Sequence, residues 1–216
     1  MTRELRAEIC RVGASLFQRG YAHGTAGNIS ARLSDGGFLI TPTDACLGTL
    51  DAQRLAQVDA QGAQTSGDRA SKTLALHRRI YDADAAAQCV IHTHSTHLVA
   101  LSLAGVWSND DIIPPITPYF VMKVGHVPLV PYHRPGDPAV GDLVSQRIRA
   151  SQAAGKPIRA VMLERLGPCV WHGNPAAAGA VLEELEETAR LWIMTRASPL
   201  GEAELEELRQ QFGISY

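Results

Sequence analysis

The sequence predicts an α/β sandwich in which a mainly antiparallel sheet is covered by helices. Strand and hairpin patterns fill the middle of the chain, and amphipathic helical patterns stand at both ends. Elements grouped in this way build an antiparallel sheet with helices packed on it. The 216 residues contain no internal repeat, low-complexity segment or long linker, so one domain over residues 1–216 is expected.

The N-terminal part is expected to form a helix followed by a hairpin. Residues 2–19 predict an amphipathic helix, because their apolar residues recur at spacings of three and four: Leu5, Ile9, Val12, Leu16 and Phe17. A turn at residues 24–28 then leads into a strand at 29–33. Asp35-Gly36-Gly37 predicts a hairpin turn that returns the chain through residues 38–41.

The central part predicts a second helix, a buried strand and a third helix. Residues 71–81 are expected to be helical, with Ser71 as the cap. The apolar run at 89–92 predicts a buried strand that ends on a histidine, and residues 97–103 predict a short helix. Residues 112–132 are rich in proline and β-branched residues and are expected to form strand and loop.

The C-terminal part predicts three helices around a strand pair. Asp137-Pro138 is a cap followed by proline at the first helical position, so a helix is expected up to about residue 150. Residues 160–163 and 169–171 are expected to pair as strands. Asn174-Pro175 opens a long helix that reaches Trp192, and the acidic segment 202–212 predicts a final helix.

Composition excludes several classes of protein. Apolar residues make up 45% and charged residues 19%, which is typical of a globular chain. The net charge of -2 gives no basic face, so no nucleic-acid partner is expected. The longest apolar runs are too short to span a bilayer, and the N-terminus lacks the apolar core of a signal peptide. Four scattered cysteines without a CxxC pair indicate a reducing compartment, so a cytoplasmic location is expected.

The histidines of the segment His92-Thr93-His94 are the sharpest chemical feature of the chain. Residues two apart on an extended strand project from the same face, so both imidazoles are expected to enter one pocket. Neutral imidazoles at this spacing are good ligands for zinc or a similar divalent ion. The pattern also fits two hydrogen-bonded strand residues, and His97 fits a packing residue or one that supports the ligands.

A set of small polar residues upstream has the composition of a phosphate pocket: Thr25, Gly27, Asn28, Thr41, Thr43, Ser71 and Lys72. Gly27-Asn28 permits close backbone approach and offers an amide side chain. Ser71 and Lys72 lie where a helix is expected to begin, and free backbone N–H groups with the positive end of the helix dipole favour an anion there. Lys72 adds a full positive charge. Each of these residues also fits an ordinary turn or helix cap.

Four segments follow one another in a recognisable order and spacing. They are Gly-Thr-Ala-Gly-Asn-Ile-Ser at 24–30, Leu-Ile-Thr-Pro-Thr at 39–43, Ser71-Lys72 with His77 six residues after Ser71, and Val-Ile-His-Thr-His at 90–94. Together they resemble the class II aldolase/adducin-like family, which includes L-fuculose-phosphate aldolase and L-ribulose-5-phosphate epimerase. The resemblance extends over nearly the whole chain. Residues 117–125, 131–138 and 185–189 resemble the 3-oxo-tetronate 4-phosphate decarboxylase branch of that family.

The resemblance implies an α/β/α sandwich that assembles as a homotetramer with sites near subunit interfaces. It implies a zinc ion bound by His92 and His94. The family's tyrosine proton donor corresponds to Tyr119, which otherwise fits a packed ring in a proline-rich loop. The implied phosphate-binding residues are Asn28, Thr43, Ser71 and Lys72.

Two residues depart from the family pattern. Thr73 stands where the family has its catalytic acid/base glutamate, and Leu166 stands where it has its third zinc histidine. Threonine does not titrate near neutral pH, and leucine cannot bind a metal. Catalytic zinc normally has three protein ligands, so another group must complete the site. The candidates are Glu164 (which also fits a salt bridge at a strand end), His97, His133, His172, a neighbouring subunit and the substrate.

The resemblance implies chemistry in which a metal polarises substrate oxygens and stabilises an enediolate. A retro-aldol cleavage also needs a base, which Thr73 cannot supply. A decarboxylation does not, because carbon dioxide leaves from an ionised carboxylate. We therefore expect metal-dependent decarboxylation of a 3-oxo-tetronate 4-phosphate to dihydroxyacetone phosphate and carbon dioxide. The alternatives are an aldolase or decarboxylase acting on another hydroxy or keto acid, and a non-catalytic ligand-binding protein on the same scaffold.

Overall fold

The structure, a computed structural model, describes residues 2–216 and contains one eight-stranded sheet in that part of the chain. The strand order is β4-β3-β2-β1-β5-β8-β7-β6. Every neighbouring pair is antiparallel except β6 and β7, which run parallel, so the predicted mainly antiparallel sheet is confirmed. The strands are β1 (Asn28–Arg32), β2 (Phe38–Ile40), β3 (Ala56–Val58), β4 (Gln64–Ser66), β5 (Cys89–His92), β6 (Leu129–Val130), β7 (Ala160–Leu163) and β8 (Gly167–His172).

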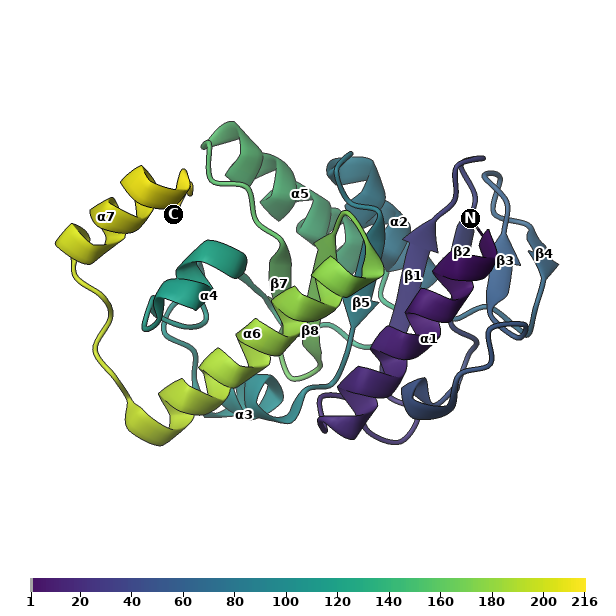
Figure 1. Cartoon of the computed structure of the whole chain (residues 1–216), viewed down its shortest axis with the longest axis horizontal. Coiled ribbons are helices and arrows are strands. Elements are labelled where there is room, and N and C mark those ends of the chain that lie inside the picture. The colour runs from purple at the N-terminus through teal and green to yellow at the C-terminus, as the bar shows by residue number, and fades with distance from the viewer. Residues whose placement is uncertain (1) are drawn as a thin grey trace.

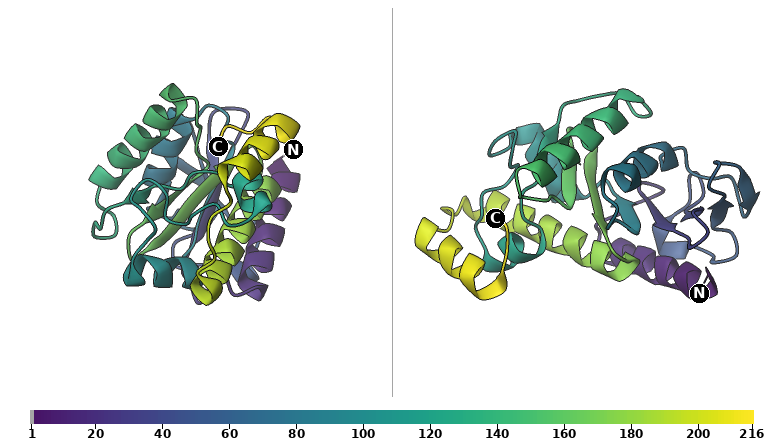
Figure 2. Two further views of the ribbon diagram at one scale, coloured as in Figure 1. Left: turned by 90° about the vertical axis from the view of Figure 1, so that its left-hand side faces the viewer. Right: turned by 90° about the horizontal axis from the view of Figure 1, so that it is seen from above.

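Helices cover both faces of the sheet and complete the predicted α/β/α sandwich. Figure 2 shows α2 and α5 on one side of the sheet and α1 and α6 on the other. None of the helices within residues 2–216 has the length and apolar character needed to cross a membrane. The helices are α1 (Thr2–Gln18), the short 3-10 helix η1 (Leu47–Thr49), α2 (Leu74–Ala83), α3 (Thr96–Ala104), α4 (Pro118–Lys123), α5 (Ala139–Ala153), α6 (Pro175–Thr195) and α7 (Glu202–Phe212) (Figure 1).

Alternation along the central strands divides the core into two layers. Ile29 and Ile91 pack into the cluster that includes Ile9 and Leu16 of α1. Val90 packs into the other cluster, which includes residues of α2 and α5. Because side chains two apart share a face of a strand, Asn28, Ser30 and His92 lie on the same side as Val90, under α2.

The core layer under α2 and α5 contains a buried cluster of three polar residues. The hydroxyl of Ser30 lies 2.8 Å from Nδ1 of His77 and 2.8 Å from the hydroxyl of Tyr81. All three residues are buried, and Nε2 of His77 has no hydrogen-bond partner among the described residues. Burial, followed by the nearby ring of His92, lowers the pKa of His77 to about 3. The imidazole is therefore neutral in the folded protein at neutral pH.

Several boundaries differ from the prediction. Residues 71–73 form a turn closed by the bond from Leu74 N to Ser71 O, so α2 begins at Leu74 and Ser71 is not its cap. The segment 112–132 contains the helix α4 as well as the strand β6. The hydroxyl of Thr117 accepts the N–H of Phe120, and Pro118 occupies the first turn of this helix.

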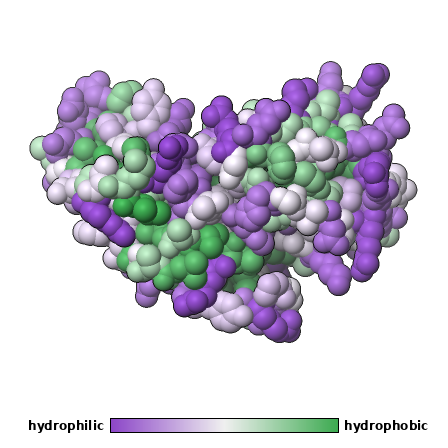
Figure 3. All heavy atoms as spheres, turned by 90° about the horizontal axis from the view of Figure 1, so that it is seen from below, coloured by the Kyte–Doolittle hydropathy of each residue, from purple (hydrophilic) through white to green (hydrophobic). Residues whose placement is uncertain are grey.

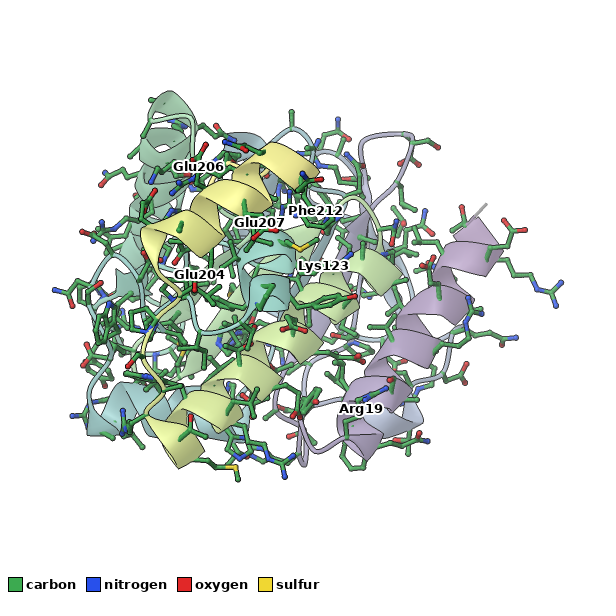
Figure 4. The ribbon with its side chains drawn as sticks, turned by 60° about the vertical axis from the view of Figure 1, so that its left-hand side comes forward. Arg19, Lys123, Glu204, Glu206, Glu207 and Phe212 are labelled. Carbon is green, nitrogen blue, oxygen red and sulfur yellow. The ribbon has the colours of Figure 1, made fainter. Side chains whose placement is uncertain are left out.

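The C-terminal helix α7 stands apart from the α1 and α6 layer and lies beside α4 (Figure 1). Figure 4 shows Glu204, Glu206 and Glu207 on this helix and Lys123 on the neighbouring helix α4. Leu205 is the buried residue of α7. The segment after α7 returns to the body, where the ring of Tyr216 stacks on His126 with centroids 4.2 Å apart.

Candidate active site

A cavity of about 700 Å³ opens beside the meeting ends of β1 and β5. It brings together residues that are far apart in sequence, and eight of the nine predicted site residues line it. The ninth, Tyr119, does not. The eight are Thr25, Asn28, Thr43, Ser71, Lys72, Thr73, His92 and His94.

Backbone pairing explains why the glycine-rich turn meets the histidine segment. Asn28 and His92 are register partners in the antiparallel pair of β1 and β5. Gly27 has a φ of 95°, and a Cβ atom there would lie 2.8 Å from the carbonyl oxygen of His92. Only glycine tolerates both this conformation and this approach, so Gly27 allows the turn to close against β5.

The two histidines present neutral imidazoles to the cavity. Nδ1 of His92 donates to the carbonyl oxygen of Pro168 at 2.8 Å, so its Nε2 carries the lone pair. Burial, then the neighbouring His94, lowers the pKa of His92 to about 4. Burial, then His23, also lowers the pKa of His94. The ring centroids of His92 and His94 are 5.1 Å apart, with an interplanar angle of 63°.

The candidate phosphate residues come from segments that a backbone bridge holds together. Pro42 and Ala70 form an isolated antiparallel bridge, which sets Thr43 opposite Arg69 and Ser71 opposite Thr41. The Thr43 hydroxyl donates to the carbonyl oxygen of Ala70 at 2.9 Å. Lys72 is exposed and makes no ion pair within residues 2–216, so its ammonium group is available to an anion.

Asn28 belongs to the candidate phosphate residues and also pairs with His92 across the two strands. It is buried and lines the cavity, and its Oδ1 has no hydrogen-bond partner among the described residues. A buried amide oxygen without a partner is costly, which makes this side chain a natural contact for a bound ligand or an ordered water molecule.

The residues present fit two ligands of a divalent metal and do not complete a three-ligand site. Leu166 lines the cavity at the family's third position. Of the four side chains predicted as substitutes, Glu164 and His133 line the cavity, whereas His97 and His172 do not. Within residues 2–216, no group of three or more His, Cys, Asp or Glu side chains is placed to hold a metal.

The two excluded histidines have other roles in the structure. His172 pairs with Cys89 at the far end of β5, away from His92. His97 is held by Glu186 of α6, whose carboxylate accepts its backbone N–H at 2.8 Å and its ring Nδ1–H at 2.9 Å. Glu186 also accepts the N–H of Leu98 at 3.1 Å, so a buried carboxylate caps α3 directly after the histidine segment. Burial raises the pKa of Glu186, and these hydrogen bonds oppose the shift.

The sequence did not predict Asp137, Arg79 or Arg134 as site residues, and it predicted His133 only as a candidate metal ligand. His133 and Asp137 both line the cavity, with His133 Nδ1 3.4 Å from Asp137 Oδ2. The backbone N–H of Ala139, followed by His133, lowers the pKa of Asp137. Arg79 and Arg134 line the same cavity. Arg79 comes from α2, which begins at Leu74 and leaves Lys72 outside the helix, so its presence in the cavity could not be inferred from a helix face shared with Lys72.

Tyr119 is 63% exposed on α4 and is therefore neither a packed ring nor a wall of its own chain's cavity. A catalytic role for this side chain requires that it reach a cavity formed by another copy of the chain.

Comparison with known proteins agrees with these features. Residues 7–193 match the family described as Class II Aldolase and Adducin N-terminal domain. A 3-oxo-tetronate 4-phosphate decarboxylase of Cupriavidus necator is 58% identical over 97% of this chain and 96% of its own length. The crystal structure of YgbL from Escherichia coli, described as a putative aldolase/epimerase/decarboxylase, has a TM-score of 0.87 at 42% identity, covering 96% of this chain and 99% of its own. An L-fuculose 1-phosphate aldolase structure shares the fold, with a TM-score of 0.79 at 20% identity, covering 98% of this chain and 97% of its own. The chain therefore belongs to the class II aldolase and adducin family.

Proposed function

We propose that the protein is a carboxy-lyase that decarboxylates a 3-oxo-tetronate 4-phosphate to dihydroxyacetone phosphate and carbon dioxide. The observation that carries the proposal is the similarity to full-length relatives with this activity in their names, at 42–58% identity. The cavity supports it, because one wall offers groups suited to a phosphate and the adjoining wall offers two neutral imidazoles. The chain acts as one domain over residues 1–216.

The substrate phosphate binds beside Lys72, with further polar contacts from Thr25, Asn28, Thr43 and Ser71. The ammonium group of Lys72 has no competing partner in residues 2–216 and neutralises part of the phosphate charge. This orientation places the carbonyl and hydroxyl oxygens of the substrate toward His92 and His94.

The bond that breaks joins C1 to C2 of the substrate. Its electron pair moves into a C2–C3 double bond, the C3 carbonyl oxygen becomes the oxyanion of an enediolate, and C1 leaves as carbon dioxide. A proton then adds to C2 and gives dihydroxyacetone phosphate. Because the 3-oxo group itself accepts the electron pair, the reaction needs an oxyanion-stabilising environment and a proton donor, but no base.

Thr73 and Leu166 are compatible with this reaction. Thr73 lines the cavity next to Lys72, where its hydroxyl can bond to the substrate but cannot remove a proton. Leu166, with Leu163 and Val130, makes part of the wall apolar. An apolar wall disfavours the charged carboxylate of the ground state more than the neutral carbon dioxide that leaves.

The proposal includes a homotetramer in which Tyr119 protonates the enediolate in the cavity of a neighbouring copy. Self-association is supported by large apolar side chains that remain exposed: Leu103, Trp107, Tyr119, Leu191, Met194 and Phe212. Figure 3 shows apolar surface gathered on the side of the molecule where α3 and α6 lie. Apolar patches on a soluble chain commonly mark protein–protein contacts.

The proposal also covers the metal, the binding partners and the cellular location. Class II aldolases typically use a divalent metal, and here zinc is the first candidate, with His92 and His94 as its protein ligands. A bound divalent ion would supply positive charge at the developing oxyanion. The chain binds a phosphorylated sugar acid and further copies of itself, and it binds neither nucleic acid nor membrane. It acts in the cytoplasm.

Product analysis tests the reaction. The protein is incubated with a 3-oxo-tetronate 4-phosphate, and carbon dioxide, dihydroxyacetone phosphate and aldehydes are quantified. Equal amounts of carbon dioxide and dihydroxyacetone phosphate support the proposal. An aldehyde product without carbon dioxide would establish an aldolase instead. Stoichiometric ligand binding without any product would establish the ligand-binding protein that Thr73 and Leu166 also suggest.

A further inference from the structure

We propose that this chain does not hold a resident divalent metal, and that an ion at His92 and His94 is retained only when a bound ligand supplies the missing oxygen ligands. The inference rests on the proposed function for the identity of that ligand. Its basis is the set of donor atoms that surrounds the two imidazoles.

The turn that carries Leu166 is pressed against the histidine segment. A Cβ atom on Gly167 would lie 2.0 Å from the carbonyl oxygen of Thr93 and 3.1 Å from Cα of His94. The backbone N–H of Leu166 donates to the carbonyl oxygen of Leu163 at 3.1 Å, which closes the turn. Of the residues in this turn, Leu166 gives the cavity an apolar side chain at the family's third ligand position, and Glu164 is the one that offers oxygen donors.

The two candidate substitute ligands that line the cavity are already engaged. Glu164 Oε2 accepts the backbone N–H of Tyr132 at 2.8 Å, which ties the carboxylate to the segment after β6. His133 lines the cavity but lies close to Asp137 at the start of α5. Neither side chain joins His92 and His94 in a group of three placed to hold a metal within the described residues.

Two imidazoles alone bind zinc weakly, since catalytic zinc sites normally have three protein ligands and an open position. An α-hydroxyketone has a carbonyl and a hydroxyl oxygen in chelating positions, so two imidazoles and one such ligand provide four donors. The cavity, at about 700 Å³, has room for a small phosphorylated hydroxyketone beside the imidazoles. Zinc and ligand must then strengthen each other's binding by the same factor, because linkage between two sites is reciprocal.

Titration calorimetry on the metal-free full-length protein tests this coupling. Zinc is titrated with and without dihydroxyacetone phosphate, and dihydroxyacetone phosphate is titrated with and without zinc. We expect each to improve the affinity of the other by about tenfold or more, by equal factors within error. Glycerol 3-phosphate, which keeps the phosphate but lacks the carbonyl, should give a smaller factor. His94→Ala should abolish the coupling.

A variant with a metal ligand at position 166 provides an independent test. Leu166→His should raise the zinc affinity of the ligand-free protein at least about tenfold and reduce the coupling. Leu166→Phe, with a ring but no nitrogen, is the matched control and should bind zinc as the parent does. If Leu166→His does not fold, the coupling measured on the parent still decides the question.

Two results would overturn the inference: parent protein that binds zinc without ligand as tightly as Leu166→His does, or an absence of coupling with dihydroxyacetone phosphate. The first result would mean that a third protein ligand comes from another copy of the chain. These outcomes are separable from the proposed function. Coupling without carbon dioxide production would refute the reaction alone, and carbon dioxide production without coupling would refute the inference alone.

Discussion

The buried imidazole of His77 makes the stability of this protein dependent on pH in a calculable way. The pKa of His77 falls from the ordinary value of 6.5 to about 3 in the folded chain. Below pH 6.5 the unfolded chain therefore binds a proton that the folded chain does not, and stability is lost as the pH falls. Each pH unit within this window is worth about 1.4 kcal/mol, so His77 alone should lower the free energy of unfolding by about 2 kcal/mol between pH 7 and pH 5.

Urea unfolding at several pH values measures this effect. The variant His77→Gln should lose about 2 kcal/mol less than the parent between pH 7 and pH 5, because its side chain does not titrate. Ile148→Val is a suitable control, since it removes one buried methylene from the same layer. It should cost about 1 kcal/mol at every pH and leave the dependence on pH unchanged. A His77→Gln variant with the same pH dependence as the parent would refute the reasoning.

Three further variants test the site and its support. Lys72→Ala should raise KM for a phosphorylated substrate about 30-fold in steady-state kinetics, since a charged contact of about 2 kcal/mol is lost, whereas Lys156→Ala, at an exposed residue outside the cavity, should leave KM unchanged. Glu186→Ala should lower the free energy of unfolding by about 2–3 kcal/mol in urea titrations, because it leaves the N–H groups of His97 and the buried N–H of Leu98 without their acceptor. Tyr119→Phe should lower kcat at least about 100-fold with little change in KM, as expected for loss of a proton donor.

Each of these expectations can fail in an informative way. Equal KM values for Lys72→Ala and the parent would remove Lys72 from the phosphate site. A Glu186→Ala variant within 1 kcal/mol of the parent would mean that water replaces the lost acceptor. Full activity of Tyr119→Phe, together with a loss of activity in His133→Asn, would move the proton donor from a neighbouring copy to the His133 and Asp137 pair of the same chain.

The elements with clear periodicity were predictable, and the exceptions have physical reasons. Five elements begin and end within about three residues of their expected bounds: α1, α6, α7, β5 and β7. Their buried faces require apolar residues at regular spacing, and this spacing is visible in the sequence. Strands β3 and β4 were not anticipated. All three residues of β4 are exposed, so no apolar alternation marks it. The helix α4 was hidden by prolines, although Thr117-Pro118 is a good helix start.

The part of the site formed by β1 and β5 was predictable from the sequence. The parts formed by segments that meet only through tertiary packing were less predictable. The glycine-rich turn and the histidine segment meet because β1 pairs with β5, and the family resemblance placed both. The wall formed by His133 and Asp137 depends on the parallel pair of β6 and β7, which no local pattern specifies. The exposed position of Tyr119 follows from how α4 packs, which one sequence does not reveal.

The hydrogen bond from His92 to the carbonyl oxygen of Pro168 has a consequence for inhibitor design. A backbone carbonyl oxygen can only accept, so the ring of His92 is held with its proton on Nδ1 and its cavity-facing Nε2 can only accept. In the metal-free protein, a compound that presents an ether or carbonyl oxygen to this nitrogen would oppose two lone pairs. A hydroxyl, amide or hydroxamic acid N–H would instead form a hydrogen bond, so selective ligands should combine such a donor with a phosphate-like anion for Lys72.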